Sequence, residues 1–202
     1  GVEQFLAQFL LPYQNRWRLD YASFRPQEAP GRDLPLRHRN DLLHTDAFPT
    51  RPTRGWRILR FFHNIHPSCT RDWIVREACS QTGPEFVPAK RARPQADGGT
   101  VRAGKHLAQA TGIASLVPQW KRTPYDEFMM RLHNTMKEDA AFQANCLREN
   151  VQFAPGSSWM VYTETVPHAV VAGQYALEQT LLVDPAAMVT RESAPVAILE
   201  KM

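Results

Sequence analysis

The stretch that decides the fold is residues 41–48, which read Asp-Leu-Leu-His-Thr-Asp-Ala-Phe. At its centre, His44 and Asp46 lie two residues apart, so on an extended chain their side chains share one face. An imidazole beside a carboxylate makes two thirds of a 2-His-1-carboxylate facial triad, which holds non-haem Fe(II) and leaves coordination positions open. A capped loop end with a surface histidine would give the same short pattern. The rest of the chain must therefore decide between the two interpretations.

Composition limits the possible classes of protein. The 202 residues are 43% hydrophobic and 22% charged, which fits one globular domain with a sizeable core. The net charge of +4 is small and scattered along the chain, so it favours an anionic substrate or surface and predicts no nucleic-acid partner. Cys69, Cys79 and Cys146 lack metal-ligand spacing and are interpreted as reduced thiols in a cytosolic protein. No apolar stretch is long enough to span a bilayer, and no signal peptide is visible.

The run 56–65 is the most strand-like part of the chain. In a strand here, Ile58 and Phe62 would share a face with Arg60. If that face is buried, Arg60 needs an anionic partner, because an unpaired buried charge is very unfavourable. A bound anion and a protein carboxylate are equally compatible with this pattern.

Helical patterns occupy other parts of the chain. Apolar spacing near the N-terminus predicts a helix within residues 1–20 that docks on the core. Thr123, Pro124 and Asp126 have the order of a helix N-cap, first position and N3 residue, and an apolar stripe follows them. Within that helix, His133 is interpreted as a surface or packing residue. The remaining predictions are a short helix at 71–79, a basic loop at 88–104 and a helix at 106–116.

The last third of the chain consists of short strands separated by turns. Strands are predicted at 151–153, 159–163, 168–172 and 175–183, with Pro-Gly-Ser and Gly-Gln turns between them. Strands on both sides of a helical insert predict a mainly β fold with helical decorations, a double-stranded β-helix of the jelly-roll, cupin-like type. We expect one domain over residues 1–202 with a helical insert at approximately 70–147. The pattern leaves the oligomeric state open.

A second histidine, His168, begins a strand in the segment Val-Tyr-Thr-Glu-Thr-Val-Pro-His-Ala-Val-Val-Ala-Gly-Gln-Tyr-Ala-Leu-Glu-Gln-Thr. With Arg-Asn-Asp-Leu-Leu-His-Thr-Asp-Ala-Phe-Pro-Thr-Arg-Pro-Thr-Arg-Gly and Arg-Ile-Leu-Arg-Phe-Phe-His-Asn-Ile, this segment resembles the Fe(II)/2-oxoglutarate-dependent dioxygenases. More closely, the chain resembles the 3-deoxy-D-manno-oct-2-ulosonic acid (Kdo) hydroxylase family, over nearly its whole length from about Asn40.

The resemblance implies a role for five residues. His44, Asp46 and His168 match the iron ligands and are the expected catalytic and metal-binding residues. In the commonest members of the superfamily, a basic residue beyond the distal histidine binds the far carboxylate of 2-oxoglutarate, but this chain has Glu178 there. In the JmjC-type branch a basic residue on the strand after His-x-Asp takes this role, and Arg60 matches it. Arg25, which precedes a proline and is expected in extended chain, is the second candidate.

The resemblance also implies a reaction. We expect Fe(II), 2-oxoglutarate as cosubstrate and ascorbate as reductant, with succinate and carbon dioxide released. The implied substrate is the Kdo sugar of Kdo-lipid A, hydroxylated at carbon 3, although another acidic sugar would fit the same pattern. Such a substrate lies in a membrane, so a cytoplasmic protein would make peripheral contact with the anionic inner-membrane surface.

Two other functions remain compatible with the sequence, because a jelly roll does not fix its substrate. One is a JmjC-like hydroxylase of a protein side chain. The other is a cupin-like module that binds a sugar or metal without turnover.

Overall fold

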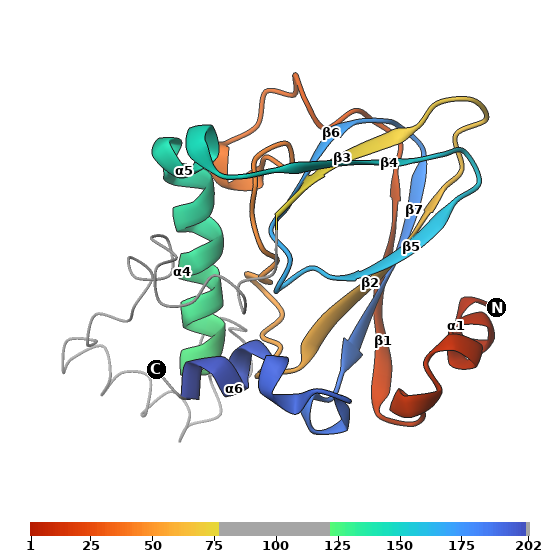
Figure 1. The fold of residues 1–202 in the computed structure, drawn as a ribbon, viewed down its shortest axis with the longest axis vertical. Coiled ribbons are helices and arrows are strands. Elements are labelled where there is room, and N and C mark those ends of the chain that lie inside the picture. Colours follow the sequence, from red (N-terminus) through yellow and green to blue (C-terminus); the bar gives the residue numbers. More distant parts are fainter. Residues whose placement is uncertain (77–121, 201–202) are drawn as a thin grey trace.

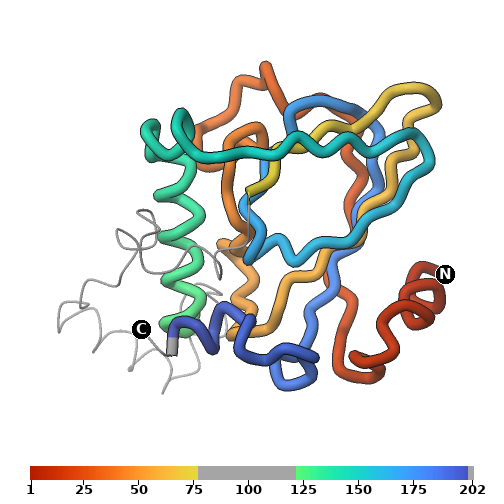
Figure 2. Tube along the Cα trace, viewed as in Figure 1, coloured from red at the N-terminus to blue at the C-terminus, as the bar shows by residue number. Residues whose placement is uncertain are grey.

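The computed structural model describes residues 1–76 and 122–200. Two antiparallel sheets face each other and form the ring seen in Figure 2. The first sheet has the strand order β1-β7-β2-β5, and the second has the order β4-β3-β6. The strands are β1 (Trp17–Arg25), β2 (Arg57–Asn64), β3 (Arg71–Val75), β4 (Glu149–Phe153), β5 (Ser158–Tyr162), β6 (His168–Ala172) and β7 (Ala176–Val183). This mainly β, two-sheet arrangement is the predicted jelly roll.

Aromatic side chains fill the space between the two sheets. Phe62 of β2 meets Trp73 of β3 edge-on, with ring centroids 4.9 Å apart. Phe153 of β4 stacks on Trp159 of β5 at 3.7 Å, and Val170 of β6 completes the cluster. Each sheet therefore contributes large rings to one shared core, which fixes the distance between the sheets.

Strand β2 confirms the predicted strand and its two faces. Phe62 points into the core between the sheets, and Arg60 lines the cavity on that same face. Leu59 and Phe61 point the other way and pack in a second cluster with Leu6 of the N-terminal helix. The alternation with period two therefore places Arg60 inside the ring.

Strand β7 lies at the centre of the first sheet (Figure 1). It pairs with β1 through a register that places Arg25 opposite Ala176. It also pairs with β2, where Arg60 lies opposite Thr180. Glu178 of β7 therefore lies near arginines from both neighbouring strands.

Helices cover the ring at its sides (Figure 1). The long helix α4 packs on the segment around His44 through Met129, Leu132 and Met136, which share a buried cluster with Leu43. On the outside of the first sheet, the N-terminal helix α1 buries Leu6. None of the described helices is long and apolar enough to cross a membrane. Residues 1–76 and 122–200 contain the helices α1 (Val2–Phe9), α4 (Pro124–Glu138), α5 (Ala140–Asn145) and α6 (Pro195–Glu200), with 3₁₀ turns η1 (Leu11–Tyr13), η2 (Leu36–His38), η6 (Pro185–Ala187) and η7 (Arg191–Ser193).

Helix α4 begins as predicted. Thr123 is the N-cap, and its hydroxyl oxygen accepts a hydrogen bond from the Asp126 backbone N–H at 3.2 Å. Asp126 Oδ2 in turn accepts from the Thr123 backbone N–H at 2.8 Å, which completes a capping box. Asp126 Oδ1 also accepts from the backbone N–H groups of Thr53 and Arg54 at 2.8 and 3.0 Å. The same carboxylate therefore ties the start of α4 to the loop before β2.

Two predictions of secondary structure need correction. The helix predicted at 71–79 is wrong over Arg71–Val75, which forms β3. Pairing with β4 and β6 on both sides and burial of Arg71 and Trp73 outweigh the weak helical pattern, so Arg71–Val75 belongs to the second sheet and not to the predicted insert. Strand β1 was not predicted; its register shifts between Leu19 and Ala22, which interrupts the period-two pattern. The loop at 88–104, the helix at 106–116 and Cys79 lie outside the described residues.

Candidate metal centre and its cationic cavity

The two predicted histidine ligands are brought together by the backbone. The His44 N–H donates to the carbonyl oxygen of His168 at 3.1 Å, and the His168 N–H donates to that of His44 at 2.9 Å. This isolated antiparallel bridge places the two imidazole rings with their centroids 4.8 Å apart. Segments far apart in sequence thus deliver adjacent ligands.

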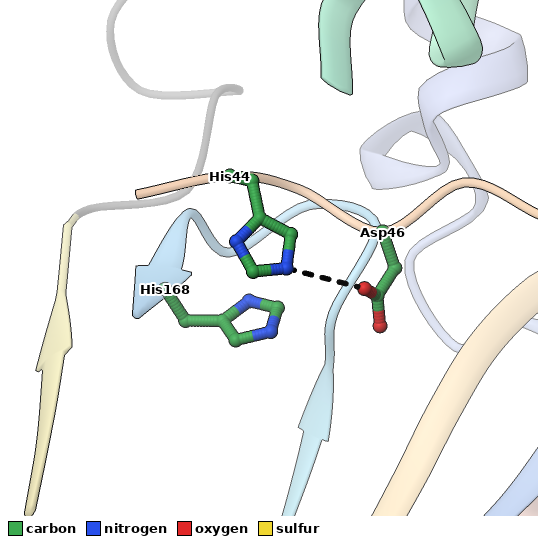
Figure 3. A group of neighbouring side chains, drawn as sticks. All are labelled: His44, Asp46 and His168. Atoms are coloured by element: carbon green, nitrogen blue, oxygen red, sulfur yellow. Dashed lines mark ion pairs between the residues drawn. The ribbon is translucent and has the colours of Figure 1, made fainter. Parts of the chain in front are cut away.

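Asp46 is fixed beside them in the same way. Its backbone N–H donates to the carbonyl oxygen of Thr163 at 2.9 Å, and its Oδ1 lies 3.7 Å from His44 Nε2 (Figure 3). One potential ligand atom from each of His44, Asp46 and His168 lies within 4.8 Å of the other two. Three donors at this separation can share one metal ion.

The orientation of the rings supports that assignment. His44 Nδ1 lies 2.7 Å from the carbonyl oxygen of Leu42, and His168 Nδ1 lies 2.9 Å from that of Val166. A carbonyl only accepts, so each Nδ1 carries the hydrogen and each Nε2 keeps a free lone pair. The residues His44, Asp46 and His168 are 3%, 7% and 5% exposed. Asp46 Oδ2 is buried and forms no hydrogen bond, although Arg60 Nε lies 2.8 Å away as an ion-pair partner. Two imidazole nitrogens with free lone pairs and one carboxylate form a donor set that fits a divalent metal.

The electrostatics favour the ligand forms of all three groups. Burial lowers the pKa of His44 below its usual value, and His168 adds to the shift. Burial also lowers the pKa of His168. For Asp46, burial acts to raise the pKa, but Arg60 and the two histidines lower it strongly. At neutral pH the centre therefore presents two neutral imidazoles and one carboxylate.

Two further side chains support the ligands. His133 of α4 meets His44 edge-on at 5.1 Å, and its Nδ1 lies 2.7 Å from the carbonyl oxygen of Thr45. Trp73 stacks on His168 with centroids 5.1 Å apart. His133 is thus a packing residue, as predicted, but the ring that it packs against is a candidate ligand.

A cavity of about 640 Å³ opens beside the centre and holds both predicted arginines. Arg60 Nε lies 2.8 Å from Asp46 Oδ2, and Arg60 Nη1 donates to Glu178 Oε1 at 2.7 Å. Arg25 donates to the other oxygen of Glu178 from Nε at 3.0 Å and from Nη2 at 2.5 Å. Arg60 therefore has the protein carboxylate partners that one interpretation of the sequence required. It also lines a cavity, where it could contact a bound anion as the other interpretation required.

Arg71 is a third arginine in the same wall. Its Nη1 donates to the carbonyl oxygen of Gly173 at 2.8 Å, while its Nε has no partner among the described residues. Gly173 allows this contact because its φ is +104° and a Cβ there would lie 2.7 Å from the Arg71 Cα. Burial lowers the pKa of Arg71 to about 10, with Arg25 adding to the shift. Arg71 thus remains charged and makes no ion pair with a carboxylate of the described chain.

All five site residues predicted from sequence therefore line one cavity. Sequence reasoning missed Arg71, because its segment was assigned to a helix, and it missed Lys137 of α4, which lines the same cavity. The period-two spacing of Arg71 and Trp73, which is typical of a strand, was the signal that could have placed Arg71. Lys137 follows His133 by one helical turn, which was the available signal for the second.

A jelly roll that presents two histidines and one aspartate to a single buried point defines a class of protein, those built around a facial-triad metal centre. The chain belongs to the 3-deoxy-D-manno-oct-2-ulosonic acid (Kdo) hydroxylase family, whose model matches residues 1–202. No curated protein is significantly similar to it in sequence.

Solved structures support the same assignment. The chain is similar to the Kdo hydroxylase KdoO, described as a non-haem Fe(II), α-ketoglutarate-dependent dioxygenase, in its complex with succinate and Fe(III) (TM-score 0.83) and in its complex with cobalt(II) (TM-score 0.84). A third structure holds α-ketoglutarate (2-oxoglutarate) and Fe(III). In the first two matches the identity is 34%, with 99% of this chain covered. The TM-scores confirm the predicted jelly-roll fold. The chain spans 64% of the length of the KdoO chains.

Proposed function

We propose that this chain is the catalytic domain of an Fe(II)/2-oxoglutarate-dependent dioxygenase that hydroxylates a Kdo sugar. One observation carries the proposal: three buried metal-ligating side chains and a cluster of arginines line the same cavity. A facial triad leaves room on the metal for a bidentate cosubstrate, and a dicarboxylate needs a cation at its far end. The KdoO complexes, which hold the iron, cobalt, succinate and α-ketoglutarate, support the same chemistry.

In this proposal, His44, Asp46 and His168 hold Fe(II), and the arginines receive the far carboxylate of 2-oxoglutarate. Arg60 and Arg25 remain the proposed anchors, and we add Arg71 because its Nε is free of partners in the described chain. Glu178 holds the first two arginines in place through both its oxygens. The three guanidinium groups outnumber the two carboxylates that they contact, Glu178 and Asp46, which leaves an excess of positive charge for a dianionic cosubstrate.

When bound, iron and 2-oxoglutarate would supply the oxidising chemistry, in which dioxygen gives one oxygen atom to the substrate and one to succinate, with release of carbon dioxide. The chain's own residues position the reactants. Carbonyl contacts at each Nδ1 hold His44 and His168 in the tautomer that binds metal. Trp73 covers His168 and limits the access of water to that ligand.

The proposed substrate is the Kdo sugar of Kdo-lipid A, hydroxylated at carbon 3. Its carboxylate and the phosphates of lipid A match the cationic lining of the cavity, to which the described residues contribute six Arg and Lys side chains and two carboxylates. We propose a cytoplasmic location with peripheral contact at the anionic inner membrane, where such a substrate is reached from the surface.

The test is succinate formation from 2-oxoglutarate with Fe(II), ascorbate as the proposed reductant, and dioxygen, with and without Kdo-lipid A. We expect turnover to depend on the substrate and the product to carry one additional hydroxyl oxygen, located at carbon 3 by mass spectrometry and NMR. Free Kdo and Kdo-free lipid A are the matched substrate controls.

The same assay separates the alternatives. A JmjC-like hydroxylase would leave Kdo-lipid A unchanged and oxidise a protein or peptide instead. A non-catalytic cupin-like module would bind metal and sugar but form no succinate beyond the rate without protein. Either result would refute the proposed reaction.

A further inference from the structure

Two buried cations of the cavity have no carboxylate partner among the described residues. One is Arg71, on β3. The other is Lys137, on the last turn of α4, which is only 3% exposed. Its ammonium has one hydrogen bond in the described chain, to the carbonyl oxygen of Arg37 at 2.9 Å. An ammonium carries three donors, so Lys137 keeps capacity for an anion.

The two cations approach the metal centre from different elements. Arg71 lies with Arg25, Arg60 and Glu178 on strands of the jelly roll, and this group reaches the centre through the Arg60–Asp46 ion pair. Lys137 lies on α4, whose His133 packs against His44. The cavity therefore has two cationic sides. The arginine wall consists of Arg25, Arg60 and Arg71 and lies beside Asp46, and the lysine wall consists of Lys137 on the helix that packs against His44.

The charged residues around Lys137 are paired with one another, which leaves the Lys137 ammonium without a carboxylate partner in the described chain. Arg37, beside Lys137, forms its ion pair with Glu138 at 2.5 Å, so its charge is already matched. Asp41 is likewise paired with Arg39 at 2.5 Å. Burial lowers the pKa of Lys137 from 10.5 to about 8, with Asp46 and Asp41 opposing the shift, so its ammonium stays charged at neutral pH. A buried cation without a partner is unfavourable, and a ligand anion would relieve that cost.

We propose that Lys137 binds the carboxylate of the acidic sugar and so selects a sugar acid over a neutral sugar. This inference rests on the proposed function, in which the reaction brings two separate carboxylate groups into one cavity. The far carboxylate of 2-oxoglutarate takes the arginine wall, and the sugar carboxylate takes Lys137. His38 and Asn40, which line the cavity from the segment before the metal ligands, supply polar contacts near the bound sugar.

The test uses Lys137→Met, which removes the charge at similar length, and Lys137→Arg, which retains it. Equilibrium binding of Kdo and of its methyl ester is measured by calorimetry on the Co(II)-loaded protein, followed by KM values for Kdo-lipid A and 2-oxoglutarate. We expect Lys137→Met to weaken binding of Kdo at least tenfold, on the order of 1.4 kcal/mol, and to bind Kdo and the ester equally. Lys137→Arg should recover part of the preference for the free acid.

Arg148→Met is the matched control, because Arg148 is exposed and lies outside the cavity. It removes the same net charge and should leave both preferences unchanged. Thermal melting of Lys137→Met checks the fold, and we expect a melting temperature no lower than that of the parent, because an apolar side chain replaces a buried charge.

Several results would overturn the assignment. If Lys137→Met loses affinity for Kdo-free lipid A but not for Kdo, Lys137 binds a phosphate of lipid A and not the sugar carboxylate. A role in cosubstrate binding is indicated if the KM for 2-oxoglutarate rises and sugar binding does not. If the parent protein binds Kdo in preference to its ester but forms no succinate, the proposed reaction fails while the subsite stands. If the parent turns over Kdo-lipid A and Lys137→Met keeps its preference for the acid, the subsite alone fails.

Discussion

Each of the three candidate ligands is expected to be essential for metal binding. His44→Ala, Asp46→Ala and His168→Ala should each abolish turnover and weaken binding of Co(II) by orders of magnitude, because a three-ligand site loses a third of its donors. Circular dichroism should show a retained fold, since the backbone bridge between His44 and His168 does not need the rings. Calorimetric titration with Co(II) measures the affinity. Full metal occupancy and activity in any variant would remove that residue from the site.

The arginine wall gives a graded prediction for 2-oxoglutarate. Losing one partner of a buried charge pair costs about 3–5 kcal/mol, so Arg60→Met and Arg71→Met should each raise the dissociation constant by roughly two to three orders of magnitude. Arg25, whose side chain is 36% exposed, should show a smaller rise of about tenfold because solvent screens it. Titration of the Co(II)-loaded variants with 2-oxoglutarate measures the three constants.

The comparison among these variants tests the ranking. Arg60→Lys should recover part of the loss, since it keeps the charge but not the planar fork. Because Arg60 also contacts Asp46, its removal should weaken metal binding as well, while Arg71→Met should not. If Arg25→Met alone loses 2-oxoglutarate affinity, the anchor has been assigned to the wrong arginines.

At the residue scale, the sequence was informative where a pattern repeats and silent where tertiary contacts decide. The spacing of His44 and Asp46 and the turn before His168 pointed to three side chains that the fold brings together. The strand alternation showed that Arg60 needs an anion, but only the sheet order shows that Glu178 is that anion. Arg71 and Lys137 come from elements that meet only in the folded chain, so sequence spacing could not place them in the cavity.

At the scale of the element, Asp126 connects two segments and should contribute more to stability than an ordinary cap. Asp126→Ala removes the capping box of α4 and leaves the buried backbone N–H of Thr53 and the partly buried N–H of Arg54 without their acceptor. The expected loss is about 2–4 kcal/mol in the free energy of unfolding, against about 1 kcal/mol for Thr123→Ala. Urea unfolding of both variants measures the difference, and equal losses would contradict this role.

The helices and strands differ in how far sequence could predict them. The start of α4 was predictable because Thr123, Pro124 and Asp126 form a local signal that needs no tertiary partner. The last four strands were also predictable, because turn residues separate them. Strand β1 has a register shift, and β3 carries a short apolar pattern that also fits a helix, so both depended on pairing that only the assembled sheets provide.

At the scale of the whole molecule, the buried histidines predict acid sensitivity of the metal-free protein. Burial lowers the pKa values of His44, His168 and His133 below 6.5 in the folded state. Below about pH 6.5 the unfolded chain therefore binds protons that the folded chain refuses, so stability falls as pH decreases until the lowered pKa values are reached. Three such groups give at most about 4 kcal/mol per pH unit.

Urea unfolding between pH 8 and pH 5 measures this dependence. The triple variant His44→Asn, His133→Asn, His168→Asn is the control and should lose most of the slope just below pH 6.5. A parent protein whose unfolding free energy is flat over this range would show that the three rings are protonated without penalty.

The proposed contact with an anionic membrane can be tested through the protein's surface. The small positive charge predicts binding to vesicles of anionic lipid that weakens as salt increases. However, Phe5 and Phe9 of α1 are 45% and 59% exposed, and their tilted rings lie with centroids 4.9 Å apart, which offers an apolar contact as well. Sedimentation with vesicles in low and high salt measures both parts. The double variant Phe5→Ser, Phe9→Ser should lose only the binding that persists in high salt. If the parent protein binds neutral vesicles as tightly as anionic ones, the contribution of charge is refuted.

The central position of β7 has a consequence for how the protein is made. Within the described chain, β1 pairs only with β7, and β7 lies between β1 and β2, although it is the last of these strands to leave the ribosome. A nascent chain that ends at Gly173 has the three candidate metal ligands but leaves β1 and β2 with unpaired edges that can join other chains. Folding of the first sheet must therefore wait until residue 183 has emerged, so pauses in translation or truncations after His168 would produce a chain prone to aggregation rather than a smaller active domain.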